Sequence, residues 1–461
     1  MISPQELVER ISAAADYLDC IVIVHEKTQA NLRWANSTLT TNGVIAERSV
    51  TVIAFVEIEG GIASGGVSRT DVAAHEIESV VKEAHIAALG AGVAADASEL
   101  AKNISVGSWS QAHVATGPDA FAKIAPALGD MFTRSNADAI ELFGYAEHSH
   151  ISTWVGSKGG LRLRWDQPVG RLEMTGKSHE RSRSTWEGVP TRDFSNVSIP
   201  DVDAIIRKRL QWQAKKIEIP AGRYDTVAPA GSVSDLLTYM FWSSAARDAY
   251  EGQSVFSGKD GAKTRIGEKL SNHAANMFSD ASYKGLESIP FIAATASGPM
   301  SSVFDNGLAQ TRTNWLTDGS LTALAQTRAS ARDTGLSFTP MGDNLIMEVP
   351  GASGTLEDLV AGVKDGLLLT TLWYIRQVDP STLLLTGLTR DGVYRVIDGE
   401  VIGAVNNFRW NESPVDLLSR MKKVGATQIT QPREWADDMD RVAMPPVLFE
   451  NFNMSTVSKA N

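Results

Sequence analysis

The hydrophobic and polar positions in the first half of the chain follow two patterns. Segments with helical patterning predict helices over residues 4–17 and 70–89, within 118–135, and over 198–217. Segments rich in β-branched and aromatic residues predict strands over residues 20–27, 31–42, 47–61, 140–157 and 160–178. Strands follow single helices without strict β-α-β alternation, which favours an α+β domain with a largely antiparallel sheet.

Capping and turn residues place the boundaries of these elements. Ser3-Pro4 has the form of a helix start, and Thr70 is expected to cap the second helix. Asn42-Gly43 and Gly60-Gly61 are expected to form turns between strands. Residues 158–160 are expected to form the loop of a hairpin.

The most apolar helix is predicted at the start of the second half. Apolar residues recur at every fourth position in residues 236–241, so two adjacent rows of the helix are apolar and belong in a domain core. Ser232 or Ser234 is expected to cap its first turn, where the helix dipole would favour the acidic Asp235. Gly252 is expected to end this helix.

The composition around Pro220 and Gly222 predicts a domain boundary near Ile217. The expected architecture has two domains: an N-terminal α+β domain of residues 1–217 with an antiparallel sheet and helices, and a C-terminal β-rich domain of residues 218–461 with a buried helix. Tight turns between strands of the second domain are expected at Asp305-Asn306-Gly307, Asp318-Gly319 and Asp398-Gly399.

Composition excludes several classes of protein. The 43 basic and 54 acidic residues give a net charge of −11, which disfavours direct contact with nucleic acid. Cys20 is the single cysteine, so an intramolecular disulfide is excluded. The charged start differs from a signal peptide, and the apolar runs are too short to span a bilayer. These features predict a cytoplasmic protein without membrane contact.

The motifs that could bind a cofactor or a metal are weak. Residues 90–95 read G-x-G-x-x-A, but they follow a helix instead of a strand and therefore indicate a helix end. His75-Glu76 and His85 are too far apart on one predicted helix to share a zinc ion, which favours surface positions. His148 and His150 would share one face of a strand and would need a third ligand from elsewhere.

Four stretches of the second half give the chain a resemblance to a known family. They are GRYDTVAPAGSVSDLL, YEGQSVFSGKDGAKTRIGEKL, VFDNGLAQTRTNWLTDGSLTALAQTRASARDTG and EDLVAGVKDGLLLTTL. In this order and spacing they resemble the TldD/PmbA family, named as modulators of DNA gyrase and as metallopeptidase subunits. LRWANSTLTTNG and STWVGSKGGLRLRW fit the same family more loosely, so the resemblance covers nearly the whole chain.

The chain departs from the family's catalytic members at the zinc site. Those members carry an H-E-x-x-x-H helix before the segment that matches SVFSG, and a cysteine near the C-terminus. Here the matching helix reads LLTYMFWSSAARD, and His273 is the one histidine of the second half. Zinc needs about three protein ligands. The departure resembles the TldE (PmbA) type of subunit, so no catalytic or metal-binding residue is assigned to this chain.

The resemblance implies a TldD–TldE heterodimer that cleaves unfolded peptides at a zinc ion held by the TldD-like partner. Without its partner, the chain is expected to be able to form a homodimer. In the complex, it would bind extended peptide, for instance by strand addition to a sheet edge. Trp373, Tyr374 and Arg376 are the candidate peptide-binding residues, with core and rim positions as the alternative. Two other functions stay open: a stand-alone hydrolase with an unrecognised site, and a regulator of a DNA gyrase complex.

Overall fold

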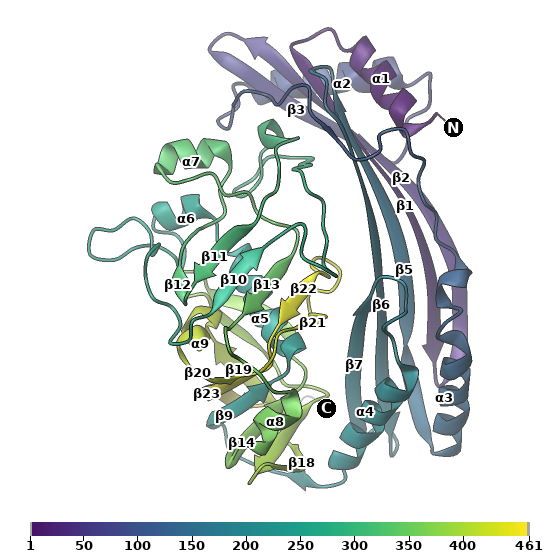
Figure 1. Cartoon of the computed structure of the whole chain (residues 1–461), viewed down its shortest axis with the longest axis vertical. Helices are drawn as coiled ribbons and strands as arrows, with labels where there is room; N and C mark the ends of the chain where they lie inside the picture. The colour runs from purple at the N-terminus through teal and green to yellow at the C-terminus, as the bar shows by residue number, and fades with distance from the viewer. Residues whose placement is uncertain (1, 459–461) are drawn as a thin grey trace.

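Long antiparallel strands form a curved sheet in the N-terminal half of the computed structural model, which describes residues 2–458 (Figure 1). The strand order is β3-β2-β1-β5-β6-β4, with β7 also paired to β6. The strands are β1 (Asp19–Ala35), β2 (Thr38–Ile58), β3 (Gly61–Arg69), β4 (Ser105–Val106), β5 (Ile140–Ser157), β6 (Arg162–Ser178) and β7 (Arg183–Thr191). Apart from the short β4, which runs parallel to β6, the pairs are antiparallel, as predicted.

The turns of this sheet confirm one prediction and correct another. Gly60 and Gly61 adopt positive φ angles of 93° and 155° between β2 and β3. Asn42-Gly43 does not form the predicted turn, because it lies inside β2 opposite residues 31–32 of β1. The chain reverses instead at Asn36 and Ser37, whose φ angles of 50° and 53° fit a two-residue hairpin loop.

Helices cover the convex face of this sheet, away from the C-terminal half (Figure 1). They are α1 (Pro4–Ala14), α2 (Ile77–Ala91), the 3₁₀ turn η1 (Pro118–Phe121), α3 (Ala125–Ala137) and α4 (Ile199–Trp212). The Ser3 hydroxyl accepts the backbone N–H of Glu6 and caps α1, as the sequence indicated. Thr70 does not cap α2. That helix begins seven residues later, because Glu76 accepts the backbone N–H of Ala73 and holds the intervening residues in a turn.

Two further sheets make up the C-terminal half. One has the order β12-β11-β10-β13-β22-β21, and the other has the order β15-β16-β19-β23-β9-β14-β17-β18-β8, with β20 paired to β23. Their strands are β8 (Lys216–Ile217), β9 (Gly222–Ala228), β10 (Asn276–Ser279), β11 (Thr313–Thr317), β12 (Ser320–Leu321), β13 (Leu345–Glu348), β14 (Asp365–Leu369), β15 (Trp373–Asp379), β16 (Leu384–Leu388), β17 (Val393–Ile397), β18 (Glu400–Val405), β19 (Phe408–Glu412), β20 (Met421–Val424), β21 (Gln428–Thr430), β22 (Val442–Met444) and β23 (Val447–Val457). The fold class is therefore α+β, as predicted.

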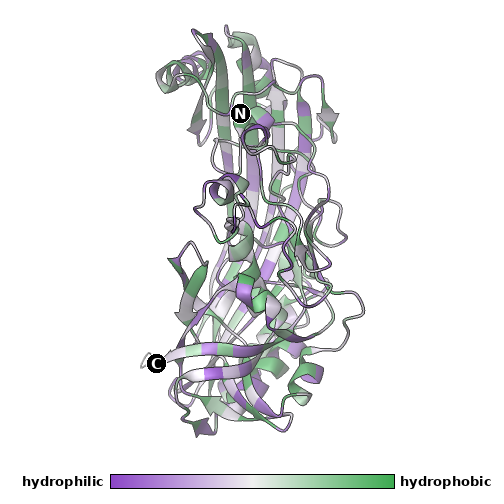
Figure 2. Cartoon of the chain, turned by 90° about the vertical axis from the view of Figure 1, so that its left-hand side faces the viewer, coloured by the Kyte–Doolittle hydropathy of each residue, from purple (hydrophilic) through white to green (hydrophobic). Residues whose placement is uncertain are grey.

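Short helices fill the spaces around these sheets. They are α5 (Ala230–Trp242), α6 (Ala246–Tyr250), η2 (Val303–Asp305), α7 (Arg328–Thr334), α8 (Leu356–Ala361) and α9 (Pro414–Ser419). Apolar and polar residues alternate along the strands of both halves, which appear banded in Figure 2. No helix of residues 2–458 is both long and apolar enough to cross a bilayer.

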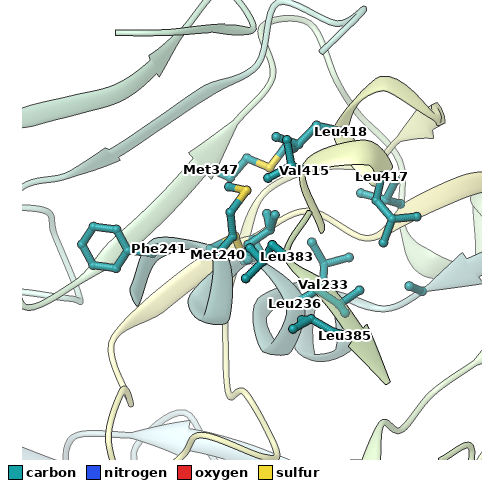
Figure 3. Packing of buried hydrophobic residues seen from close by; sticks show 14 of the residues in the cluster. Val233, Leu236, Met240, Phe241, Met347, Leu383, Leu385, Val415, Leu417 and Leu418 are labelled. Atoms are coloured by element: carbon teal, nitrogen blue, oxygen red, sulfur yellow. The ribbon is translucent and has the colours of Figure 1, made fainter. Parts of the chain in front are cut away.

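The predicted buried helix is α5, which lies in the core of the C-terminal half. Its Val233, Leu236 and Met240 pack in one cluster with Leu383 and Leu417 from other segments (Figure 3). The helix is buried along most of its length because strands of both C-terminal sheets pack against it.

Both predicted ends of α5 are wrong. The helix starts after Pro229 and not at Ser232 or Ser234, whose hydroxyls donate to the carbonyls of Leu369 and Gly231. Proline fixes φ near its helical value, so the chain enters the helix directly from β9. The helix ends at Trp242, and Gly252 instead follows the separate helix α6.

Two of the three predicted turns in the C-terminal half connect strands. Asp318-Gly319 joins β11 to β12, and Asp398-Gly399 joins β17 to β18, all with positive φ. Asp305-Asn306-Gly307 does not join strands. The Asn306 side chain accepts the backbone N–H of Ala294 and donates to its carbonyl, at 2.5 and 2.9 Å, so it bridges two loops instead.

Candidate functional site

A cleft of about 1110 Å³ lies between the concave face of the N-terminal sheet and the C-terminal half. Its walls come from segments that are far apart in the sequence, from His25 to Arg441. Its size and its mixture of apolar and hydrogen-bonding walls make it the candidate ligand site.

The sheet wall of the cleft carries hydrogen-bonding side chains at alternate strand positions. His25 lies on β1, Thr153 on β5, and Trp165 and Gln167 on β6. His25 Nδ1 is 2.9 Å from the Thr153 hydroxyl, and the Trp165 indole donates to Gln167 Oε1 at 2.9 Å. Burial lowers the pKa of His25, so its imidazole is neutral at pH 7. Alternation along paired strands places these groups on one face.

The opposite wall is apolar and rich in methionine. Trp242, the last residue of α5, lines this wall together with Met300, Met341 and Met439. The Trp242 ring packs edge-on against Trp435, with 5.5 Å between the centroids. Methionine side chains are flexible and polarizable, so this wall can adapt to apolar groups of different shapes.

Ion pairs fix the charged residues at the edge of the apolar wall. Arg328 donates from Nε to Asp305 Oδ1 at 2.7 Å and from its backbone N–H to Oδ2 at 3.1 Å. Arg441 Nη2 is 2.7 Å from Asp343 Oδ2, and its Nη1 is 2.8 Å from Asp440. These carboxylates are therefore neutralised from within the C-terminal half.

A buried carboxyl holds the segment at Glu434 and Trp435 against α5. Asp235 Oδ1 accepts the backbone N–H of Glu434 at 2.8 Å, and the Trp435 indole donates to the Asp235 carbonyl at 2.8 Å. Burial raises the pKa of Asp235 well above its usual range. The predicted role of Asp235 at a helix N-terminus is wrong, because it lies in the second turn and binds another segment.

The predicted peptide-binding residues lie on the edge strand β15, outside the cleft wall. Trp373 is covered by the Arg433 guanidinium, 3.0 Å from the ring centroid. Tyr374 is exposed, and Arg376 pairs with Glu434 at 3.5 Å. Their role in peptide binding stays a prediction.

The histidines singled out in the sequence do not converge on a shared ligand. His148 lies on the convex face, where its ring nitrogens are 2.6 Å from the Thr116 hydroxyl and 2.7 Å from the Arg192 carbonyl oxygen. His150 packs against His113 with 5.8 Å between the centroids. Within residues 2–458, no three His, Cys, Asp or Glu side chains are grouped so that they could hold a metal ion.

The remaining candidates have structural positions. His75 is exposed before α2, and His85 packs against Tyr17 with 5.2 Å between the centroids. Gly92 adopts φ of 75° at the end of α2, which confirms that residues 90–95 form a helix end.

The cleft itself was missed by sequence reasoning. Its walls combine a few residues from each of five strands of the sheet with residues of α5 and of several loops, and each looks like an ordinary strand or loop residue in the sequence. The concentration of Met in the second half was a weak signal.

Comparisons with known proteins identify relatives of this arrangement. A model of the PmbA/TldA metallopeptidase C-terminal domain matches residues 221–456. The crystal structure of TldE from Thermococcus kodakarensis aligns with a TM-score of 0.76 at 13% identity, over 97% of this chain and 98% of that chain. No curated protein matches the sequence.

Two structures described as candidate modulators of DNA gyrase have the same fold. The protein from Thermotoga maritima aligns with a TM-score of 0.74 at 18% identity, over 97% of this chain and 99% of that chain. The protein from Bacteroides thetaiotaomicron aligns with a TM-score of 0.74 at 15% identity, over 99% of this chain and 100% of that chain. At these identities the similarity establishes the shared fold.

Proposed function

Since the chain belongs to the PmbA/TldD metallopeptidase family, we propose that it is a TldE-like subunit without a metal site of its own. It holds extended peptides in its cleft and completes the active site of a zinc-bearing, TldD-like partner in the cytoplasm. The chain alone forms a homodimer through the surface that otherwise binds the partner.

The residues on α5 support the metal-free part of this proposal. The resemblance places the zinc ligands of catalytic members on the helix that matches α5. Here α5 and α6 contain no histidine or cysteine, and Asp235 Oδ1 is occupied by the Glu434 N–H. These residues do not fit zinc, which prefers about three N, S or O ligands around an open position. We therefore place no reaction step on a metal held by this chain.

The cleft supports the peptide-holding part. Instead of a metal ligand, α5 contributes Trp242 to the cleft wall. The Met-rich wall provides an adaptable surface for apolar side chains of a peptide. On the sheet wall, neutral His25, Thr153 and Gln167 offer hydrogen bonds to a peptide backbone without selecting a charge.

The direct test mixes this chain with the TldD-like protein of the same organism. We expect the mixture to run as a complex by light scattering and to cleave an unfolded, fluorescein-labelled polypeptide, and we expect zinc removal to abolish cleavage. Full peptidase activity from this chain alone, or a mixture that neither associates nor cleaves, would contradict the proposal.

Two matched tryptophans test the role of the cleft. Trp242 and Trp212 each end a helix, and each packs edge-on against one aromatic ring, but Trp242 alone lines the cleft. Trp242→Ala should lower kcat/KM of the complex by about tenfold, equivalent to about 1.4 kcal/mol of lost binding. Trp212→Ala should leave it unchanged. Equal effects of the two variants would show that the cleft does not bind substrate.

Elemental analysis of the purified chain tests the proposal that it has no metal site of its own. Protein purified without chelator and without a His tag should contain only substoichiometric transition metal. One tightly bound zinc per chain would contradict the metal-free assignment.

A further inference from the structure

Half of β2 forms an open edge of the N-terminal sheet. β3 pairs with β2 from Val50 to Ile58. Residues 38–49 of β2 pair with β1 on one side, and no strand of residues 2–458 pairs with their other side. The backbone groups that point outward along this stretch are therefore free to pair with an added strand.

This open edge lacks the usual protection against strand pairing. Apart from the half-buried Gly43, residues 38–47 are all exposed. The stretch contains no proline, and its charged residues come at its end, at Glu47 and Arg48. Exposed edges of this length are normally covered, interrupted by proline or charged along their length.

The open edge leads into the cleft. Glu47, Arg48 and Ser49, at its upper end, line the cleft, as do the last residues of β3, Ser68 and Arg69. Arg48 points to one face of the sheet, and its neighbours Glu47 and Ser49 point to the other. Because all three line the cleft, the cleft extends to the edge of the strand. A strand that continued the line of β3 below Arg69 would lie along the open edge with one end in the cleft.

We propose that residues 38–49 of β2 bind the peptide substrate as an added strand and lead its end into the cleft. This inference rests on the proposed function. The ten residues 38–47 correspond to roughly 33 Å of extended chain. Because the contacts are to the backbone, the edge selects an extended conformation over a particular sequence.

The exposed apolar residues of the edge favour a peptide over a second subunit. Leu39, Val44 and Ile45 are 49%, 50% and 53% exposed. Val44 and Ile45 are adjacent in β2 and point to opposite faces, so the three do not form one patch. A stable subunit interface needs a contiguous apolar surface, whereas an added strand places side chains on both faces.

Hydrogen exchange locates the bound peptide. The probe is a fluorescein-labelled, twelve-residue peptide of alternating Thr, Val and Lys, added to the full chain. Its binding should slow exchange in the fragment covering residues 38–49. The fragment covering 373–379, which contains another exposed edge strand, β15, and Tyr374, serves as the control. Protection at 373–379 without protection at 38–49 would overturn the inference and support the sequence-based candidates.

Two proline variants test the backbone contacts. Neighbouring amides in a strand point to opposite sides, so Thr41→Pro and Asn42→Pro remove one outward N–H and one N–H directed at β1. The variant that retains the native circular dichroism spectrum has lost the outward donor, and it should bind the probe about tenfold more weakly, equivalent to about 1.4 kcal/mol. N-methylation of the probe at alternate residues gives a second readout, in which only one of the two sets should abolish binding.

The outcomes separate this inference from the proposed function. If Trp242→Ala abolishes binding of the probe while neither proline variant weakens it, the open edge does not bind the peptide, and the proposed role of the cleft stands. No binding at all would overturn both. A proline variant that changes the mass of the complex and not the affinity for the probe would show that the edge binds a subunit instead.

Discussion

Burial shifts the pKa of histidines in the N-terminal half of the molecule and of carboxyl groups in the C-terminal half. In the N-terminal half it lowers the pKa of His25, His113 and His150. In the C-terminal half it raises the pKa of Asp235 and Glu412. In each case removal of water disfavours the charged form. The same physical cause therefore gives the two halves opposite responses to acid.

The direction of each response follows from proton binding. A histidine with a lowered pKa binds fewer protons when folded, so stability falls as the pH drops through about 6.5, the pKa of the unfolded state. A carboxyl with a raised pKa binds more protons when folded, so stability rises as the pH drops through that raised pKa towards about 4. Asp19 at the start of β1 is an N-terminal carboxyl with the second behaviour.

The largest expected effect comes from creating a buried carboxylate without its cationic partner in the C-terminal half. Arg328→Ala removes the guanidinium from Asp305, whose side chain is 3% exposed. Breaking a buried ion pair costs about 3–5 kcal/mol of unfolding free energy at pH 7, because the remaining charge stays buried. Urea unfolding measures this loss, and part of it should be recovered at lower pH.

The control for that variant lies on the same helix. Arg332 of α7 is exposed and donates to Ser98 and Ala97, so Arg332→Ala should cost about 1 kcal/mol or less. Equal losses in the two variants would show that Asp305 is solvated and that burial does not govern this half.

A smaller effect is expected when the buried carboxyl itself is removed. Asp235→Asn retains an oxygen for the Glu434 N–H but cannot ionise. The variant should therefore lose the gain in stability that Asp235 contributes on acidification from pH 7. Urea midpoints between pH 4 and pH 7 measure the gain, with the exposed Asp438→Asn as the control. If the urea midpoint of Asp235→Asn depends on pH as that of the wild type does, a group other than Asp235 causes the gain in stability.

In the N-terminal half the corresponding variant is His25→Gln. A glutamine keeps a hydrogen bond to Thr153 and removes the group that must stay neutral. The variant should reduce the loss of stability below pH 6.5 by at most about 1.4 kcal/mol per pH unit, the limit for one proton. His75→Gln, at an exposed position, is the control. A steeper loss of stability in His25→Gln than in the wild type would contradict the assignment.

The two halves also differ in how far the sequence predicts them. Strand β5 coincides with the predicted segment 140–157, because long antiparallel strands impose regular patterning and tight turns. The ends of α5 were not predictable from Ser232, Ser234 or Gly252, because contacts with other segments decide them. Asn42-Gly43 misled for a related reason: pairing with β1 outweighed its local preference for a turn.

The candidate site was less predictable than the fold. The absence of histidine and cysteine from the α5 segment is visible in the sequence, so the metal-free hypothesis could be formed there. The cleft could not be predicted, since residues from both halves of the chain, such as His25 and Trp242, line it together. The spacing of residues within one helix or strand does not predict which distant segments line a cleft together.

The smallest effect is expected at His85 of α2 and at His75, just before that helix, which test whether the N-terminal response is confined to buried groups. His75 is exposed, and His85 contacts Tyr17 from a half-buried position. Replacing His75, Glu76 and His85 together with Ala should change the free energy of unfolding little, because exposed substitutions usually stay within about 0.5 kcal/mol each. Peptide cleavage by the reconstituted complex should be unchanged, and so should the acid response measured by urea unfolding between pH 5 and pH 7. If cleavage is lost while the fold is intact, these residues form a site that their spacing conceals; if the acid response disappears, it arises at the surface and not from burial.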